Sequence, residues 1–384
     1  MPSNAIDVRE RIAAAVADVR AGKMVILVDD EDRENEGDLT LAAELVTPEA
    51  INFMATHGRG IICLALTEEQ VERLGLPMMQ SPGISGPPLG TAFTVSVEAR
   101  DGVTTGVSAA DRARTVRVAA DPSSRSRDIT SPGHVFPLKA QRGGVLVRTG
   151  QTEGAVDLAR LAGLTPAGVI CEVMNADGTM ARRPDLERFS KTHGIRIATI
   201  ADLIQHRLLT ERLVRRTSEA TLNLALTRTE WRVVVYESAV SARQYLALVK
   251  GDLSGGGAPL CRVHTGSTWN DVFGPVGAEA GRGLRDAIEL IEHEGRGALV
   301  YVAPLGDVRR EIEELIPGAA AVAKRAPNDP PLRDIGLGAQ VLADLGVHEL
   351  RLLTSHPRRI AGIEGFGLHV VERVPLPCAC DAAE

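Results

Sequence analysis

Seven carboxylates and one arginine fall within the ten residues Asp29–Asp38, directly after a short apolar run. Like charges at this density repel one another unless a cation or a cationic ligand relieves them. Hard oxygen ligands suit Mg²⁺, which keeps several waters and often shares the phosphate or hydroxyl groups of a substrate. Arg33, in the middle of the carboxylates, suits an anionic or hydroxylated ligand. The segment therefore predicts a metal and substrate site, and a solvated acidic loop is the alternative.

A second candidate site is the segment Arg148–Thr152, between a predicted strand at Val145–Val147 and a predicted helix at Glu153–Ala162. Thr152 is the predicted N-cap of that helix, and Gly150 permits a close approach of the backbone. The N-terminus of a helix with an arginine just before it is an anion site, so the segment favours a bound phosphate. A simple capped turn between strand and helix is the alternative.

Two further residues have the chemistry for proton transfer. His134 follows a predicted Pro-Gly turn, which would present it as a general acid or base near neutral pH. Glu172 lies inside an apolar strand, where a carboxylate is costly unless it is paired or used. Burial there would raise its pKa toward the range useful for proton transfer. A hydrogen-bonded structural histidine and a salt bridge on the face of the strand are the alternatives.

Short apolar runs that alternate with segments of helical periodicity must position these residues. Such alternation predicts a mixed α/β fold. Strands are predicted at Met24–Val28, Ile61–Leu66, Phe93–Val97, Val145–Val147, Val169–Val173 and Ile195–Ile200, and helices at Glu153–Ala162, Asp185–Thr192 and near Asp111–Val118, the last with Ser108 as its N-cap.

The composition excludes several other classes of protein. The formal net charge is −7, whereas nucleic-acid binders usually carry a basic surface. No apolar run approaches the ~20 residues of a membrane span, and the mixed charges of the first residues do not resemble a signal peptide. The five cysteines are scattered, and Cys63, Cys171 and Cys261 lie in or beside apolar runs. We therefore expect reduced thiols in a cytoplasmic protein that binds neither nucleic acid nor membranes.

The length and a change in composition indicate two domains. At about 100–200 residues per domain, a chain of 384 residues is expected to form two. The segment Gln205–Arg216 is basic and helical in character, and new strand-like runs follow at Trp231–Tyr236 and Ala298–Val302. We expect a first α/β domain over residues 1–205 and a second α/β domain over residues 206–384, with a linker helix at the boundary.

In its first domain the chain resembles the 3,4-dihydroxy-2-butanone-4-phosphate synthase family. The resemblance covers about residues 5–205, and its motifs follow one another in the family's order. They are DDEDRENEGDL, GVTTGVSAADR, PGHVFPL, the Arg-x-Gly-x-Thr-Glu turn, LARLAGL and GVICEVMNADGTM. Members of this family are lyases of riboflavin biosynthesis. They convert D-ribulose 5-phosphate into L-3,4-dihydroxy-2-butanone 4-phosphate and formate, use Mg²⁺ (or Mn²⁺), and form homodimers.

The resemblance implies roles for the candidate residues. Arg33, Glu34 and Asp38 would contact the substrate, and Glu34 would also bind the metal. Arg148 and Thr152 would hold the phosphate.

His134 and Glu172 match the family's two essential catalytic positions, and Glu172 would also bind the substrate. The expected chemistry is enolisation, loss of water, a skeletal shift and expulsion of formate. Each step needs proton shuttling, and the metal would stabilise the enediolate charge.

Two positions depart from the family pattern. Gln151 stands where the family usually has a histidine that binds the metal. Its neutral amide oxygen is a plausible hard ligand, so the resemblance implies Gln151 as the second metal ligand. Ser131 stands where the family usually has an arginine, which would weaken the charge pairing near His134.

Residues from about 220 to 377 resemble GTP cyclohydrolase II, the usual fusion partner of this family. The matching segments include Cys261–His264, Asp271–Gly274, Glu294–Gly297, Arg333–Gln340 and Gly365–Leu368. The resemblance implies the fold of that enzyme.

The catalytic groups of GTP cyclohydrolase II are replaced. Its three zinc-binding cysteines align with Ser267, Ala278 and Ala280, which offer no thiolate. Its proton-accepting aspartate aligns with Pro331. The terminal pair Cys378-Ala-Cys380 supplies two thiols, whereas a structural zinc site needs four ligands. We therefore expect no zinc and no opening of the GTP ring.

Three hypotheses follow. The first is an active synthase with an accessory second domain. The second is a regulatory or binding homologue in which both sites are degraded, which Gln151 and Ser131 would favour. The third is a bifunctional enzyme with GTP cyclohydrolase II activity, which would require zinc. Retention of the other candidate site residues favours the first, with D-ribulose 5-phosphate and a second copy of the chain as its partners.

Overall fold

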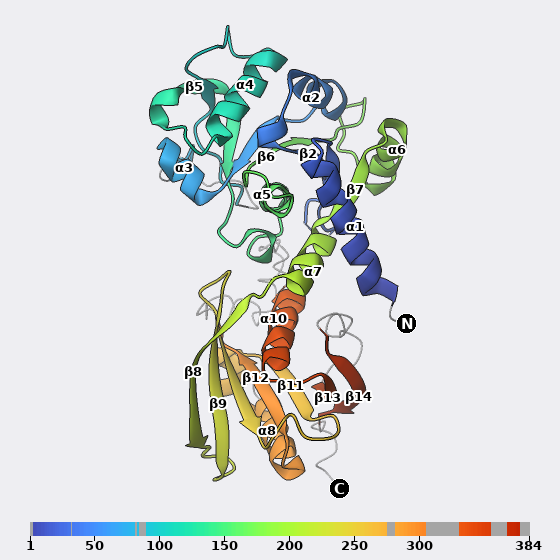
Figure 1. The fold of residues 1–384 in the computed structure, drawn as a ribbon, viewed down its shortest axis with the longest axis vertical. Helices are drawn as coiled ribbons and strands as arrows, with labels where there is room; N and C mark the ends of the chain where they lie inside the picture. Colours follow the sequence, from blue (N-terminus) through green and yellow to red (C-terminus); the bar gives the residue numbers. More distant parts are fainter. Residues whose placement is uncertain are drawn as a thin grey trace. The chain divides into compact units, whose positions relative to one another are not determined.

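The structure is a computed structural model, and it describes residues 3–31, 33–80, 83, 90–274, 281–304, 330–354 and 367–376. The chain forms two compact units and passes from the first to the second between His206 and Arg207. Each unit has its own sheet (Figure 1). In these ranges no helix combines the length and the apolar character that crossing a membrane requires.

The described part of the first unit contains a mixed seven-stranded sheet with the strand order β4-β5-β3-β6-β2-β1-β7. Strand β1 pairs antiparallel with β2 and parallel with β7, and β2 pairs antiparallel with β6. The main elements are α1 (Ser3–Arg20), β1 (Val25–Val28), β2 (Gly37–Ala42), α2 (Pro48–Phe53), β3 (Cys63–Leu66), α3 (Glu68–Leu74), β4 (Val97–Ala99), α4 (Ala109–Ala120), β5 (Ile129–Lys139), α5 (Gln151–Leu161), β6 (Gly168–Glu172), α6 (Arg183–His193), β7 (Arg196–Thr199) and α7 (Ile200–Thr210).

Helices cover both faces of this sheet because its strands are apolar on both sides. Successive side chains of a strand point to opposite faces. In β1, Val25 and Leu27 pack in one core with α1 and α5, whereas Ile26 and Val28 pack in another with α2 and α4. The result is the predicted mixed α/β fold. The predicted cap of α4 is also confirmed, because the Ser108 side chain accepts a hydrogen bond from the Asp111 N–H.

The strand predicted at Val145–Val147 is wrong. These residues overlap the 3₁₀ helix η4 (Gly144–Leu146). Gly143 and Gly144 have φ values of 96° and 64°, a left-handed conformation that interrupts a strand and favours glycine. The Val145 N–H donates to the buried carboxylate of Asp157 on α5 (2.9 Å), so the turn is tied to the helix that follows it.

The linker helix predicted at Gln205–Arg216 is only half present. Helix α7 ends at Thr210, and strand β8 begins at Val214, so the basic residues at 215 and 216 lie in a strand. Val214 is buried, while the other nine residues of β8 are exposed. A mixture of basic and apolar side chains suits an edge strand as well as it suits a helix. Composition alone therefore does not distinguish the two in this segment.

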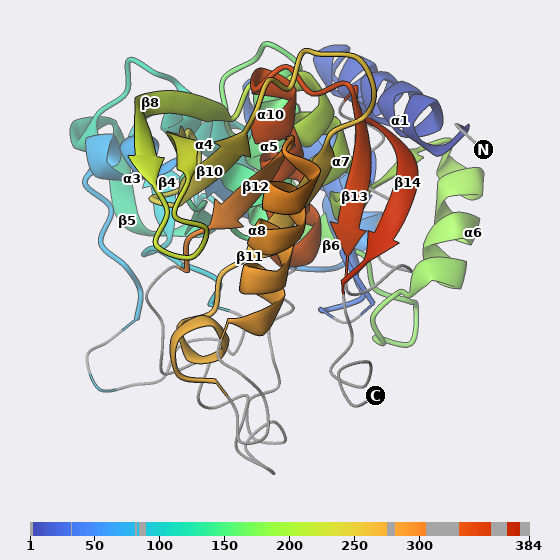
Figure 2. The same cartoon turned by 90° about the horizontal axis from the view of Figure 1, so that it is seen from below.

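The described part of the second unit contains a seven-stranded sheet with the order β14-β13-β11-β12-β10-β9-β8. In strand β11, Leu260 packs against α8, while Val263, three residues later, contacts Gly338 of α10. Because side chains alternate along a strand, the two helices lie on opposite faces of the sheet (Figure 2). The elements are β8 (Val214–Asn223), β9 (Glu230–Ser238), β10 (Gln244–Lys250), β11 (Leu260–Thr265), α8 (Arg282–Glu294), β12 (Gly297–Val302), α10 (Pro330–Asp344), β13 (Glu349–Thr354) and β14 (His369–Pro375).

Candidate active site

A pocket in the first unit lies where the β1–β2 loop, the end of β6 and the start of α5 meet. All but one of the eight site residues named from the sequence line it, and His134 does not. The pocket is lined by Arg33, Glu34, Glu36, Asp38, Cys63, Thr91, Phe93, Leu138, Arg148, Gln151, Thr152, Ile170 and Glu172.

The acidic loop between β1 and β2 is folded around the buried carboxylate of Asp29. One oxygen of this carboxylate accepts from the backbone N–H of Glu36 (2.9 Å), and the other accepts from the N–H of Glu34 (3.2 Å). Asn35 between them takes the left-handed conformation, with a φ of 53°. Asparagine tolerates that conformation better than most residues, so the DEDRENEGD sequence is compatible with this tight turn.

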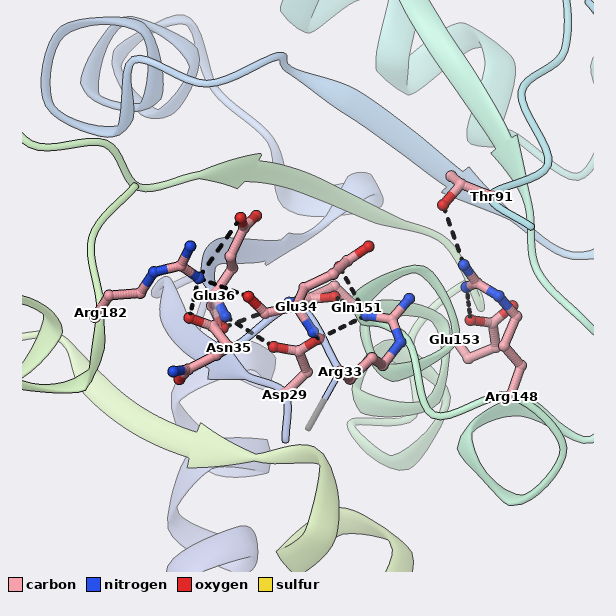
Figure 3. A network of polar contacts seen from close by, with 10 residues as sticks. All are labelled: Asp29, Arg33, Glu34, Asn35, Glu36, Thr91, Arg148, Gln151, Glu153 and Arg182. Atoms are coloured by element: carbon pink, nitrogen blue, oxygen red, sulfur yellow. Dashed lines mark hydrogen bonds and ion pairs between the residues drawn. The ribbon is translucent and has the colours of Figure 1, made fainter. Parts of the chain in front are cut away.

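Arg33 connects the acidic loop to helix α5. Its Nη1 donates to Asp29 Oδ2 (2.6 Å), to Glu34 Oε2 (2.7 Å) and to Gln151 Oε1 (3.0 Å), as Figure 3 shows. Burial works to lower the pKa of Arg33, but the carboxylates of Glu34 and Asp29 outweigh it, and the pKa is raised. The guanidinium is therefore held as a fixed positive charge beside Glu34 and Gln151.

Asp38 and Glu172 bring two more carboxylates to the pocket. Leu39 of β2 and Cys171 of β6 point into the core under α2 and α4. Alternation therefore turns Asp38 and Glu172 toward the opposite face, where α5 lies. Burial raises the pKa of Asp38 well above its usual range, and the negative charge of Glu172 adds to the effect.

Glu172 and Glu36 also have raised pKa values, mainly because of burial. Part of the charge of Glu172 is satisfied locally, because its Oε2 accepts from the backbone N–H of Ile61 (2.8 Å). Even so, Arg33 does not balance the carboxylates gathered here. The pocket favours protonated carboxyl groups or a bound cation.

The predicted phosphate segment lies at the N-terminus of α5, but its cap differs from the prediction. The helix begins at Gln151 and its N-cap is Gly150, so Thr152 is the second helical residue and not the cap. A side chain at position 150 would displace the guanidinium of Arg148 from its place beside the helix end. The first turn of a helix leaves backbone N–H groups without partners inside the helix, and its residues Gln151 and Thr152 line the pocket.

Arg148 is held in place beside that helix end. Its Nη1 donates to Glu153 Oε2 (2.6 Å), and its Nη2 donates to the hydroxyl of Thr91 (3.1 Å; Figure 3). Glu153 is buried, and burial raises its pKa against the opposing effect of Arg148. The sequence does not single out Thr91 or Glu153, although the charge of Glu153 next to a predicted anion site is a visible signal.

His134 lies on β5, outside the pocket. Its Nδ1 is 2.7 Å from Glu98 Oε2, and the same oxygen accepts from the His134 backbone N–H (3.2 Å). An ionised carboxylate only accepts hydrogen bonds, so this contact places the proton on Nδ1 and leaves Nε2 for exchange. The imidazole is 48% exposed, whereas Glu98 is buried. The sequence does not single out Glu98, which is a lone carboxylate in an otherwise apolar strand, as Glu172 is.

The Pro-Gly turn predicted before His134 is instead part of strand β5. The register of β5 against β4 jumps here, because Val97 pairs with Val135 while Glu98 pairs with Thr130. The residues between those partners therefore bulge from the ladder. Ser131, where the resemblance leads us to expect an arginine, donates from its hydroxyl to the Ser96 carbonyl (2.7 Å).

The donor set of the pocket suits a hard cation that brings its own waters. The carboxylate of Glu34 and the amide oxygen of Gln151 both accept hydrogen bonds from the Nη1 of Arg33. The two oxygens therefore flank the position that this nitrogen occupies. In the residues that the structure covers, no three His, Cys, Asp or Glu side chains form a ready metal cage. Mg²⁺ is commonly bound through one or two protein oxygens together with water and substrate, so these residues fit it.

In the second unit a polar cluster lies beside Ser267, whose backbone N–H donates to Asp271 Oδ2 (3.0 Å). The ring of His264 lies 3.0 Å from Asp271 Oδ1, and Tyr301 donates to the other oxygen of Asp271 (3.1 Å). Ser267 accepts at its hydroxyl from the Asn270 N–H (3.2 Å), so it caps a turn. Ala278, Ala280, Cys378 and Cys380 lie outside the described residues.

Comparison with known proteins gives the same two parts. The model of the 3,4-dihydroxy-2-butanone 4-phosphate synthase family matches residues 13–206, and that of GTP cyclohydrolase II matches residues 215–375. A riboflavin biosynthesis protein RibBA of Aquifex aeolicus is 48% identical over 381 residues, which cover 95% of this chain and 92% of that protein. A 3,4-dihydroxy-2-butanone 4-phosphate synthase of Pseudomonas aeruginosa is 48% identical over 363 residues, which cover 94% of this chain and 97% of that protein.

A solved structure matches almost the whole chain. It is the crystal structure of RibBX, described as a two-domain 3,4-dihydroxy-2-butanone 4-phosphate synthase from A. baumannii. It is 41% identical, covers 95% of this chain and 99% of that one, and superposes with a TM-score of 0.78. Both units of the present chain thus have counterparts in one solved protein.

Proposed function

The chain belongs to the 3,4-dihydroxy-2-butanone 4-phosphate synthase family of riboflavin biosynthesis, and we propose that the pocket at the start of α5 is its active site. The first unit is a lyase domain, and D-ribulose 5-phosphate fits its activity. The site assignment rests on one observation. Two arginines, Arg33 and Arg148, line the same pocket as the carboxylates of Asp38 and Glu172. This set can hold a phosphate at one end and exchange protons at the other.

The phosphate of D-ribulose 5-phosphate binds at the N-terminus of α5. Arg148 lies beside that helix end, and Thr152 lines the same pocket in the first helical turn. A helix N-terminus and a guanidinium both favour a phosphate dianion. The sugar hydroxyls then extend toward Arg33, Glu34 and Asp38.

Mg²⁺ is the metal of this family, and Glu34 and Gln151 would hold it here, with Mn²⁺ as a substitute. When bound, it supplies positive charge that stabilises the enediolate oxygens of the substrate. Arg33 now touches both of these side chains, so it would turn its charge toward the substrate.

Asp38 and Glu172 move protons on the substrate carbons. A general acid or base works best when its pKa lies near the pH of the reaction, and burial raises the pKa of both carboxyls toward that range. Glu172 is further oriented by the Ile61 N–H, which fixes one of its oxygens.

His134 acts in the active site of a second copy of the chain. It is half-exposed and does not line the pocket of its own chain, yet Glu98 fixes its tautomer, as a proton-transfer histidine requires. A homodimer that brings His134 of one protomer to the pocket of its partner accounts for both features. We place this dimer in the cytoplasm, where its buried thiols at Cys63, Cys171 and Cys261 stay reduced.

The second domain, expected from the sequence over residues 206–384, is catalytically inactive and serves as an accessory domain. Ser267 caps a turn where the family's first zinc thiolate is expected, and alanines replace the other two. Metal analysis of the purified protein is expected to find no zinc, and incubation with GTP no formate or ring-opened product. A stoichiometric zinc and GTP turnover would instead establish the bifunctional alternative.

Formate release from D-ribulose 5-phosphate tests the proposed active site. We expect release with Mg²⁺ and none with EDTA, and loss of release in Glu34→Ala. Glu31→Ala is the matched control, because it removes an exposed carboxylate from the same loop. If folded wild type releases no formate with Mg²⁺ or Mn²⁺, the regulatory or binding hypothesis takes its place.

A further inference from the structure

Arg182 holds the outer side of the acidic loop. It is the residue just before α6, and its Nη1 donates to the backbone carbonyls of Glu34 and Asn35, both at 2.6 Å. The same nitrogen lies 3.7 Å from a carboxylate oxygen of Glu36. Figure 3 shows Arg182 and Arg148 at the two ends of the polar network, with Arg33 and Gln151 between them.

The geometry of these contacts makes Arg182 a specific clamp. A terminal guanidinium nitrogen carries two N–H groups, and each of them meets one of two consecutive peptide carbonyls. Asn35, between those carbonyls, has the left-handed φ of 53°. Asp29 binds the N–H groups on the inner side of the same turn, so the loop is fixed from both sides.

Arg182 is itself anchored to the sheet. Its backbone N–H donates to Asp185 Oδ2 (2.9 Å), which caps the start of α6. One turn later, Leu186 is fully buried and packs directly against Gly37. A side chain at position 37 would collide with it. Helix α6 is thus locked to the first residue of β2, and Arg182 reaches the loop from a rigid base.

We propose that Arg182 is a positioning residue for metal binding, an inference that rests on the proposed role of Glu34 as a ligand. Arg182 does not line the pocket, and its side chain is 45% exposed, so it acts through the loop and not on the substrate. Fixing the carbonyl of Glu34 sets the direction of the Glu34 side chain before a cation arrives. Without this contact, the loop has to be ordered at the moment of binding, which weakens the affinity.

Metal binding to the full-length protein tests this role directly. Mn²⁺ titrations followed by electron paramagnetic resonance, without substrate, compare wild type with Arg182→Ala. We expect the variant to bind Mn²⁺ about tenfold more weakly, the scale of a charge-assisted hydrogen bond. The Mg²⁺ concentration for half-maximal formate release rises in parallel, while kcat at saturating Mg²⁺ stays within about twofold. Arg183→Ala is the matched control, because that arginine neighbours Arg182 but forms an exposed pair with Glu187 on the surface of α6 (2.9 Å).

Unchanged Mn²⁺ affinity in Arg182→Ala would overturn the proposal, as would a loss of kcat that saturating Mg²⁺ does not restore. If circular dichroism shows that the alanine variant does not fold, Arg182→Gln decides the question by the same titration, because glutamine keeps part of the aliphatic stem. Wild type that binds Mn²⁺ but releases no formate refutes the proposed function alone, since the comparison of Mn²⁺ affinities still tests Arg182.

Discussion

Asp38 and Glu172 lie directly opposite each other on the antiparallel strands β2 and β6, and the pKa of each carboxyl is raised. Opposite residues of an antiparallel pair have their Cβ atoms about 4.5–5.5 Å apart, and like charges at that spacing destabilise the sheet. Both residues line the pocket, where we propose that they exchange protons with the substrate. The pair therefore links the stability of the first unit to its activity.

Asp38→Asn should stabilise the metal-free protein at alkaline pH. The folded pKa of Asp38 lies above its unfolded value, so below about pH 4 both states are protonated and Asp38 has no effect. As the pH rises, the unfolded state ionises first, and the free energy of unfolding of wild type falls until the folded pKa is passed. Asp38→Asn does not lose this stability. The free energy of unfolding that wild type loses is about 1.4 kcal/mol for each unit by which the folded pKa of Asp38 exceeds its unfolded pKa.

Calorimetry in EDTA at pH 4.5 and pH 8 measures the effect, and equal stability of the two proteins at pH 8 would contradict it. Tryptophan fluorescence tests whether the stabilised unit is the first one. Both tryptophans of the chain, Trp231 and Trp269, lie in the second unit. The transition seen by tryptophan fluorescence should therefore stay at the same temperature in Asp38→Asn.

Gln151→His should change the preferred metal. An imidazole nitrogen favours Mn²⁺ over Mg²⁺ relative to an amide oxygen, so the ratio of the Mn²⁺ and Mg²⁺ concentrations for half-maximal activity should fall by roughly tenfold. Formate release with each ion measures this ratio. Gln244→His, an exposed position in the second unit, controls for binding to an added histidine. A constant ratio would show that residue 151 is not a ligand.

Glu98→Gln should remove most of the contribution of His134. The amide donates as well as accepts, so it no longer fixes the proton on Nδ1, and kcat should fall by roughly 100-fold, the scale of a lost general acid or base. The pH profile of kcat should change shape in the same variant. Glu68→Gln, which breaks a half-buried ion pair with Lys139, is the control. Near-normal kcat in Glu98→Gln would mean that the tautomer of His134 does not matter.

Arg148→Ala should weaken the binding of the phosphate. KM for D-ribulose 5-phosphate is expected to rise roughly 10–100-fold with a smaller change in kcat, and inhibition by inorganic phosphate should weaken in parallel. Arg160→Ala, on an exposed part of the same helix, is the control. An unchanged KM together with unchanged phosphate inhibition would place the phosphate elsewhere.

Much of the site follows from local sequence. A five-residue apolar run followed by charges predicts β1 and the loop after it. An apolar run containing one carboxylate predicts β6, although the structure places Glu172 at the end of that strand and not inside it. These features depend on neighbouring residues alone. Strand β2 is not predicted, because its second residue, Asp38, completes the acidic block and hides the start of the strand.

The remaining site residues depend on tertiary contacts. Arg182 is separated from Glu34 by 148 positions and Glu98 from His134 by 36, so no spacing in the sequence indicates that they meet. The strand expected at Val145–Val147 fails for a related reason. Its residues are apolar enough for a strand, but the left-handed glycines before them and the carboxylate of Asp157 on the next helix select a tight turn.

One nitrogen of Arg33 touches both side chains that are proposed to bind the metal. At the proposed metal site, loading would therefore exchange one cation for another, and the lost contacts of Arg33 would offset part of the attraction of the metal. Such a site stays folded when no metal is present and empties without collapse. Its occupancy should then follow the free magnesium concentration of the cell, so that supply of the metal sets the fraction of enzyme ready to work.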